Sequence, residues 1–165
     1  MSDPILDRLF RHMAWANQLL FEQLTSVPEA ALALSADNDE WSVGAILMHF
    51  VRSSGFYVAR VTGDELRTDF HIPFTHRYIR ELAIRCAESD ARLRELAGEP
   101  EAMTTFIRDG VTIHRARSTI IGQSIHHATE HRAQIADILS LHAIRAIDLD
   151  AMDVWAYSDA EGLGQ

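Results

Sequence analysis

The chain has 165 residues, of which 47% are apolar and 24% charged, which suffices for one domain with its own hydrophobic core over residues 1–165. Its formal net charge of −9 argues against nucleic acid and anionic membranes as partners, because both repel an acidic surface. The sequence has one cysteine and no apolar run long enough for a membrane span, so it predicts a cytoplasmic protein without an internal disulfide.

The first predicted helix begins at Asp3, which can accept hydrogen bonds as an N-cap and is followed by Pro4 in the first turn. Apolar residues then recur at intervals of three and four, as on the buried face of a helix, until the segment ends near Ser26. Asn17 lies within this apolar face, so its amide must find hydrogen-bond partners in the interior.

A second helix is predicted from its N-cap Ser42 to about Thr62, with Gly63 as the C-terminal stop. Trp41 precedes the cap and can pack against the helix as a hydrophobic staple. His49 lies at the edge of the apolar face, a position typical both of pocket-lining and of half-exposed side chains.

Residues 63–75 show no sustained periodicity and predict a long connection to the third helix. Thr75 is the expected N-cap of that helix, which runs to about Ala97. Its inner face is predicted to include Cys86 and Ser89.

β-Branched residues on both sides of Asp109-Gly110 predict a β-hairpin, and Ser118 is then the expected cap of a fourth helix to about Ala143. Four amphipathic helices of about 20 residues bury their apolar faces best against one another. The sequence therefore predicts an all-α fold. It is a four-helix bundle with a long crossover connection between helices 2 and 3 and a small β-hairpin before helix 4.

The fourth helix contains the segment QSIHHATEHRAQI, which holds three of the nine histidines. His127 and His131 lie one turn apart at the edge of the buried face, so both imidazoles can bind one divalent ion. His126 points to the polar face instead. A third ligand must come from another helix, and His49 is the first choice and His12 the second. Three histidine ligands leave an open position for water or substrate.

Residues 127–131, HATEH, also match the pattern H-x-x-E-H of inverzincin peptidases, in which Glu130 would be the general base. Inverzincins are much larger and take a further glutamate ligand from far downstream. Only 34 residues follow His131 here, so a metallopeptidase is a remote alternative.

Three segments together resemble the DinB-like (YfiT-like) superfamily. They are RHMAWANQLL (residues 11–20), WSVGAILMHFV (residues 41–51) and IHHATEHRAQI (residues 125–135), in that order, with the Asp-Gly hairpin before the last. The third segment is the most specific, because it is similar to the family ending N-H-x-x-H-H-R-G-Q. The resemblance covers the chain from about Asp3 to Tyr157.

The resemblance implies a crossover four-helix bundle, often a homodimer, that holds a divalent metal through one histidine of the second helix and an H-x-x-x-H pair of the last. By position these ligands are His49, His127 and His131, and zinc or nickel is the expected metal. The departures from the family pattern are His126 for Asn, Glu130 for His and Ala133 for Gly. None of them removes a ligand, but Glu130 changes the charge beside the site.

Characterised members of the superfamily include thiol-dependent S-transferases and a mycothiol-dependent maleylpyruvate isomerase, whose metal activates a low-molecular-weight thiol. The resemblance thus implies a metal-dependent S-transferase or thiol-dependent isomerase acting on a small-molecule substrate. Glu130 is the candidate acid or base, and Ser124, Gln123 and Gln134 are candidates for orienting the cofactor. The alternative is a non-catalytic metal-binding stress-response protein, in which the ion holds helices 2 and 4 together.

Overall fold

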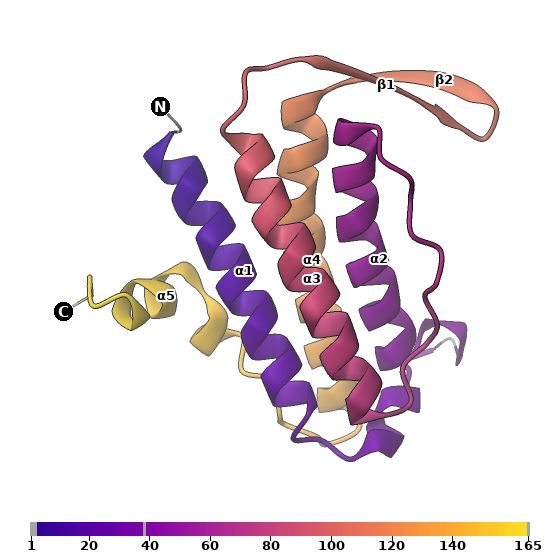
Figure 1. The fold of residues 1–165 in the computed structure, drawn as a ribbon. Coiled ribbons are helices and arrows are strands. Elements are labelled where there is room, and N and C mark those ends of the chain that lie inside the picture. Colours follow the sequence, from indigo (N-terminus) through magenta and orange to yellow (C-terminus); the bar gives the residue numbers. More distant parts are fainter. Residues whose placement is uncertain (1–2, 38, 165) are drawn as a thin grey trace.

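The computed structural model describes residues 3–37 and 39–164, and the described residues form a helical bundle with a hairpin at one end (Figure 1). Its α-helices are α1 (Pro4–Leu24), α2 (Val43–Thr62), α3 (His76–Ala97), α4 (Arg117–Leu141) and the short α5 (Val154–Ala160). Strands β1 (Met103–Arg108) and β2 (Val111–Ala116) pair in antiparallel register, with Phe106 opposite Ile113. Short 3-10 turns occupy Glu29–Ala33, Asp39–Trp41 and Asp150–Met152.

The direction of the helices confirms the predicted crossover bundle. Figure 1 shows α1 and α4 running one way and α2 and α3 running the other. Since α2 and α3 are parallel, the chain from Gly63 to Thr75 must return along the whole length of the bundle. The hairpin lies across the end where α2 finishes and α4 begins (Figure 1).

Local side-chain caps explain where three of the helices begin. The Asp3 carboxylate accepts hydrogen bonds from the backbone of Ile5 and Leu6, and the hydroxyls of Ser42 and Thr75 cap α2 and α3. These caps agree with the sequence prediction.

Helix α4 does not begin as predicted, because Ser118 is not its cap. The residue at the cap position is Ala116, whose side chain has no hydrogen-bonding group. The Glu101 carboxylate, from the loop before β1, accepts a hydrogen bond from the Ser118 backbone N–H at 3.3 Å instead. A carboxylate distant in sequence thus accepts a hydrogen bond from a free backbone N–H of the first turn, and no local sequence pattern predicts this contact.

Gly63 ends α2 in the left-handed conformation, with φ of 81°. We expect Gly63→Ala to lower the free energy of unfolding by about 1 kcal/mol, because a Cβ is strained at this φ. Gly122→Ala is the matched control, since Gly122 lies inside α4 and a Cβ there meets no atom within 4 Å. It should stabilise the fold by about 0.5 to 1 kcal/mol. Urea unfolding followed by circular dichroism measures both changes in the free energy of unfolding. If both substitutions change it in the same direction, Gly63 does not require the left-handed conformation.

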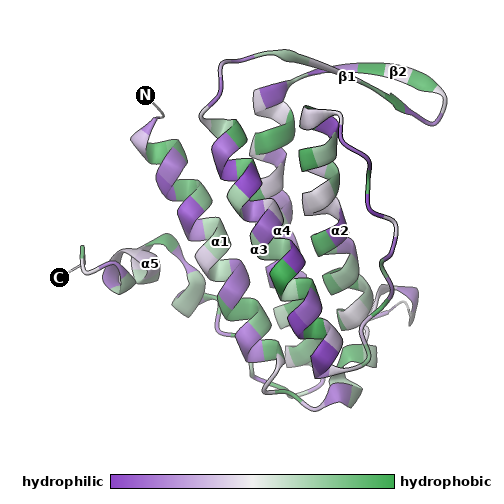
Figure 2. Cartoon of the chain, viewed as in Figure 1, coloured by the Kyte–Doolittle hydropathy of each residue, from purple (hydrophilic) through white to green (hydrophobic). Residues whose placement is uncertain are grey.

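Apolar side chains from all four long helices fill the centre of the bundle, and polar and apolar residues alternate along α1 and α3 in Figure 2. The fully buried large side chains include Phe10, Leu20, Ile46, Phe50, Leu82, Leu93 and Ile135. The inner face of α3 corrects one expectation. Ser89 is only partly buried, whereas its neighbour Asp90 is 2% exposed.

Asp90 belongs to a buried polar cluster with Asn17 of α1 and Arg132 of α4. The Asn17 amide donates to Asp90 Oδ2 at 2.9 Å, and its oxygen accepts from the Arg132 guanidinium. Cys86 is also buried, with its thiol 3.6 Å from the same Asp90 oxygen. The requirement that Asn17 find interior partners is therefore met by two charged residues from α3 and α4.

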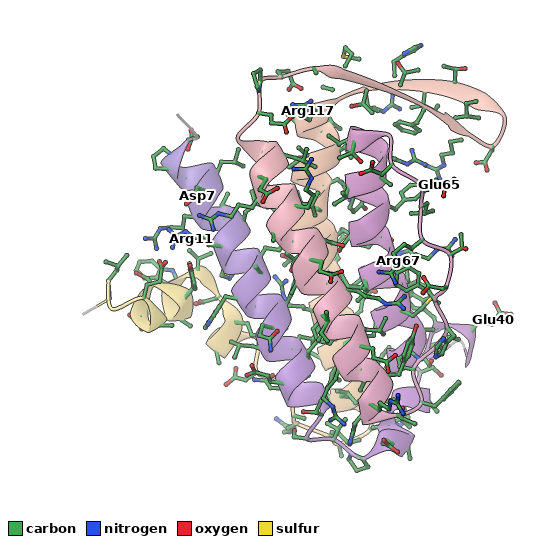
Figure 3. The ribbon with its side chains drawn as sticks, viewed as in Figure 1. Asp7, Arg11, Glu40, Glu65, Arg67 and Arg117 are labelled. Carbon is green, nitrogen blue, oxygen red and sulfur yellow. The ribbon has the colours of Figure 1, made fainter. Side chains whose placement is uncertain are left out.

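The C-terminal segment contains α5, which packs against α1. The rings of Trp15 and Tyr157 lie 5.3 Å apart, and Arg11 contacts Tyr157 and Glu161. Arg11 also pairs with Asp7 of its own helix, and Figure 3 labels both residues on α1. Within the described ranges, no helix is long and apolar enough to cross a bilayer.

Candidate metal centre

Three histidine side chains from two helices converge between α2 and α4. His127 Nε2 lies 3.1 Å from His49 Nε2 and 2.9 Å from His131 Nε2. One ligand nitrogen from each of the three lies within 4.8 Å of the others. His131 is buried, and His49 and His127 are half-buried. The predicted pair on the last helix and the predicted third ligand are thus brought together.

The spacing and chemistry of these donors fit a divalent ion. Two nitrogens bound to one zinc at about 2.0 to 2.1 Å lie about 2.9 to 3.4 Å apart when the bond angle is about 90 to 110°. The Nε2 atom of His127 lies 3.1 Å from that of His49 and 2.9 Å from that of His131, and both distances fall in that range. Imidazole nitrogen suits zinc, nickel, iron and copper alike. The cluster can therefore hold a metal ion, and its donors alone do not select which one.

The histidines are also held in the protonation state that binds metal. Burial lowers the pKa of all three imidazoles below its ordinary value, and for His127 the pKa falls to about 4 because the neighbouring rings add to the effect. All three are consequently neutral at pH 7. A neutral imidazole has a free nitrogen lone pair, so binding an ion there requires little proton release.

Two further side chains position the ligands. His131 Nδ1–H donates to Gln134 Oε1 at 2.7 Å, which leaves the Nε2 lone pair of His131 directed at the other histidines. The indole of Trp41 lies edge-on to His49 and His131, with ring centroids 5.1 and 6.0 Å away. Trp41 thus covers the cluster, a role that its prediction as a helix staple missed.

We expect Gln134→Leu to weaken zinc binding by about 10- to 100-fold, because it removes the acceptor that orients His131. Gln134→Glu keeps an acceptor at this place and should retain most of the affinity. Competition with a chromophoric chelator measures both constants. Identical affinities for Gln134→Leu and the wild type would show that Gln134 does not position the ligand.

A pocket of about 720 Å³ opens beside the cluster, between α2, α4 and the hairpin. His49 and His127 form part of its wall, together with Tyr57 of α2 and Gln123 of α4. The ring of Tyr57 meets the ring of His127 edge-on at 5.7 Å. An ion held by the three histidines is therefore accessible to small molecules in this pocket.

Comparison with known families gives a match over most of the chain. The model of the DinB family matches residues 1–146. The chain belongs to the DinB family. It is thus a member of the DinB/YfiT-like superfamily, as the resemblance of the three segments predicts. Searches of curated proteins and of solved structures found no match to this chain.

The other residues predicted for the site of this DinB protein fall in different places. Gln123 lines the pocket and Gln134 contacts a ligand, as described above. Ser124 is buried and its hydroxyl donates to the carbonyl of Ile121 in the same helix, so it faces the interior and not the pocket. Glu130 is exposed, yet close enough for its charge to act on Tyr57 and His131.

The remaining histidines have other partners. His12, the second choice for a ligand, is buried beside the C-terminal segment, where its Nε2–H donates to the Met152 carbonyl at 2.8 Å. His126 is exposed, as predicted. The contacts of the others are His71 with Tyr78, His76 with Val27, His114 with Thr105 and His142 with Ser35. The third histidine of the cluster is thus His49, which precedes the pair in the sequence, whereas inverzincins take a glutamate from downstream.

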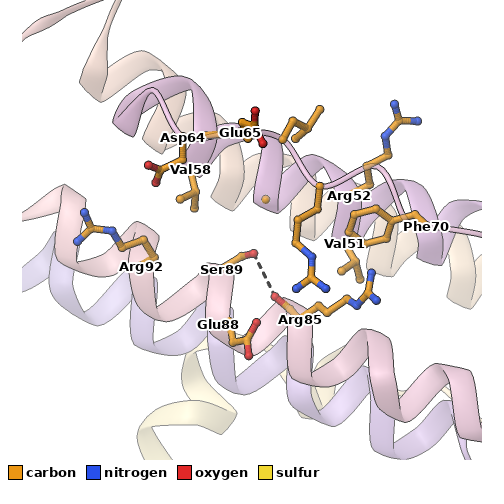
Figure 4. Close-up of a pocket in the computed structure, with 14 residues that line it drawn as sticks. Val51, Arg52, Val58, Asp64, Glu65, Phe70, Arg85, Glu88, Ser89 and Arg92 are labelled. Atoms are coloured by element: carbon orange, nitrogen blue, oxygen red, sulfur yellow. Dashed lines mark hydrogen bonds between the residues drawn. The ribbon is translucent and has the colours of Figure 1, made fainter.

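A second cavity in this DinB protein, of about 230 Å³, lies between α2, α3 and the crossover connection (Figure 4). Its lining contains charges of both signs, among them Arg85, Glu88 and Arg92. Arg85 already pairs with Asp69 at 2.9 Å. Since no histidine is among its lining residues, this cavity is separate from the metal centre.

Proposed function

We propose that this DinB protein is a metal-dependent enzyme that activates a low-molecular-weight thiol, for S-transfer or thiol-dependent isomerisation of a small molecule. The observation that carries the proposal is an open pocket of about 720 Å³ beside the three-histidine cluster, with His49 and His127 of the cluster in its wall. A structural ion needs no such access, because structural zinc sites are closed by four protein ligands.

The residues around the pocket support this chemistry. A bound divalent ion supplies positive charge, which lowers the pKa of a thiol or water beside it, and neutral ligands leave that charge undiminished. Burial and the negative charge of Glu130 raise the pKa of Tyr57, so its phenol stays protonated and can donate a hydrogen bond in the pocket. Glu130 is the proposed acid or base, and Gln123 orients the ligand.

Turnover measurements test the proposal. Protein loaded with zinc or with nickel is incubated with a panel of small thiols and an electrophilic substrate such as an aryl halide. We expect thiol-dependent product with the wild type and none with His131→Ala, whereas Glu130→Gln should keep the metal and lose rate. Absence of thiol-dependent turnover across the panel, with a stoichiometric metal bound, would refute the proposal.

The structural-metal alternative predicts a different result when the ion is removed. Helices α2 and α4 already pack through buried apolar residues such as Ile46, Phe50 and Ile135. We therefore expect chelation to abolish activity and to lower the melting temperature by only a few degrees, about the effect of 1 kcal/mol. Calorimetric scans of loaded and stripped protein measure the shift. Loss of the cooperative transition on chelation would favour the structural role instead.

A further inference from the structure

The lining of the metal-site pocket is positively charged, although the chain as a whole has a net charge of −9. Three arginines line it, Arg60 of α2 and Arg108 and Arg115 of the hairpin, against a single acid, Asp109. In the described part of the chain, Arg108 pairs weakly with Asp109 at 3.6 Å, and Arg60 and Arg115 have no ion-pair partner. An acidic protein has thus gathered unpaired cations at one pocket.

Arg60 is held in place by aromatic rings. Its guanidinium lies 3.8 Å from the ring centre of Phe56 and 3.7 Å from that of Phe106, one residue from α2 and one from β1. Stacking of this kind fixes the plane of the guanidinium and leaves its N–H edge free for a planar anion. Burial and the charge of Arg108 lower the pKa of Arg60, and the nearby Asp109 offsets this effect only in part.

The hairpin register brings the other two arginines to the same side. Residues two apart in a strand share a face, so Arg108 lies on the face of Phe106. Arg115 is paired with Thr104, which is also on that face. Both arginines therefore accompany Phe106 on the hairpin face that meets α2.

The cationic cluster and the histidines lie at opposite ends of the pocket. His49 and Arg60 are both on α2, eleven residues apart, which corresponds to about 16 Å along the helix axis at about 1.5 Å per residue. The arginine side chain spans part of this distance, because side chains on a helix lean toward its N-terminus. A ligand that contacts both groups must be elongated.

We infer that this pocket selects elongated small molecules that have a carboxylate at the end remote from the reacting atom. The carboxylate binds Arg60, Arg108 and Arg115 beneath the hairpin, and the other end reaches the three histidines. The second half of this statement rests on the proposed function. The first half, recognition of the anion, does not.

Two matched pairs of ligands test the inference. Octanoate and 1-octanol, without sulfur, are titrated into the metal-free full chain, and 8-mercaptooctanoate and 8-mercapto-1-octanol into the zinc-loaded chain. Calorimetry gives the dissociation constants. We expect each carboxylate to bind about tenfold more tightly than its alcohol, because a guanidinium forms charge-assisted hydrogen bonds with the carboxylate alone.

Variants identify the residues responsible. Arg60→Gln should abolish the preference for the carboxylate, while Arg80→Gln, which removes the same charge from the exposed face of α3, should preserve it. If Arg60→Gln fails to fold, the double variant Arg108→Gln and Arg115→Gln on the exposed hairpin takes its place. Equal affinities for octanoate and octanol, or a preference that survives these substitutions, would overturn the inference. A preference without any gain from the thiol would count against the proposed function alone.

Discussion

His131→Ala is expected to reduce the affinity for zinc or nickel by more than about 100-fold. Substitution of a residue that only hydrogen-bonds to a metal ligand already costs about 10- to 100-fold in affinity. His131 contacts His127 at 2.9 Å and is oriented by Gln134 at 2.7 Å. It is also the most buried of the three. Its loss leaves two ligands on two different helices, which is too few for a stable site. Metal analysis of protein purified without a histidine tag, and chelator competition, measure the change.

His126→Ala provides the matched control for this experiment. It removes an imidazole from the same helix, but the side chain of His126 is exposed and outside the cluster. The metal content should therefore stay at one ion per chain. If His126→Ala loses the metal as completely as His131→Ala, the ion is not bound by the cluster described here.

Arg132→Met is expected to lower the free energy of unfolding at pH 7.5 by about 3 kcal/mol, the typical cost of breaking a buried charged network from one side. The substitution leaves the Asn17 oxygen without its donor and removes the positive charge that acts on Asp90. Arg132 itself is buried and still cationic, because burial lowers its pKa only to about 10. Urea unfolding measures the loss.

The cost of Arg132→Met should depend on pH through Asp90. Burial raises the pKa of this carboxyl from 3.8 to about 6, so between about pH 4 and 6 the folded chain binds a proton that the unfolded chain does not. The stability that Asp90 contributes consequently falls as the pH rises through this window. At pH 5 the carboxyl is mostly neutral and needs Arg132 less, so the destabilisation should be smaller than at pH 7.5.

Asp90→Asn separates this effect from the loss of packing. In the Asp90→Asn background no carboxylate is left to ionise, and Arg132→Met should cost the same at both pH values. If Arg132→Met destabilises the chain that retains Asp90 equally at both pH values, Asp90 does not titrate in this window.

The helices and the hairpin follow from local patterns, and for that reason the sequence predicts them well. Each relies on neighbours in the chain, such as Thr75 capping α3 or Gly63 ending α2 with positive φ. The candidate metal-binding pair follows in the same way, because His127 and His131 are related by a single helical turn. The relative directions of side chains within one helix follow from its periodicity and do not depend on the other elements.

Several of the incorrect predictions depend on contacts between distant parts of the chain. Helical periodicity permits either Ser89 or Asp90 on the inner face of α3, and an ionisable residue is the less expected choice. Asp90 is buried because Asn17, 73 positions away, donates to it. The sequence ranks His49 before His12 as the third ligand but cannot place His12, which the structure shows bound to the Met152 carbonyl of the C-terminal segment.

Helix α2 carries both a histidine of the cluster and an arginine of the pocket, and this bears on how such a protein acquires new substrates. The helix links His49 of the histidine cluster rigidly to Arg60, while the other two arginines of the pocket belong to the hairpin, which supplies no residue to that cluster. The proposed reactive centre and the proposed anion-binding element therefore lie on separate parts of the fold. Under the two proposals, substitutions at the ten exposed positions of the hairpin change which ligands are recognised and leave the histidine cluster intact, so the hairpin is the natural target for engineering.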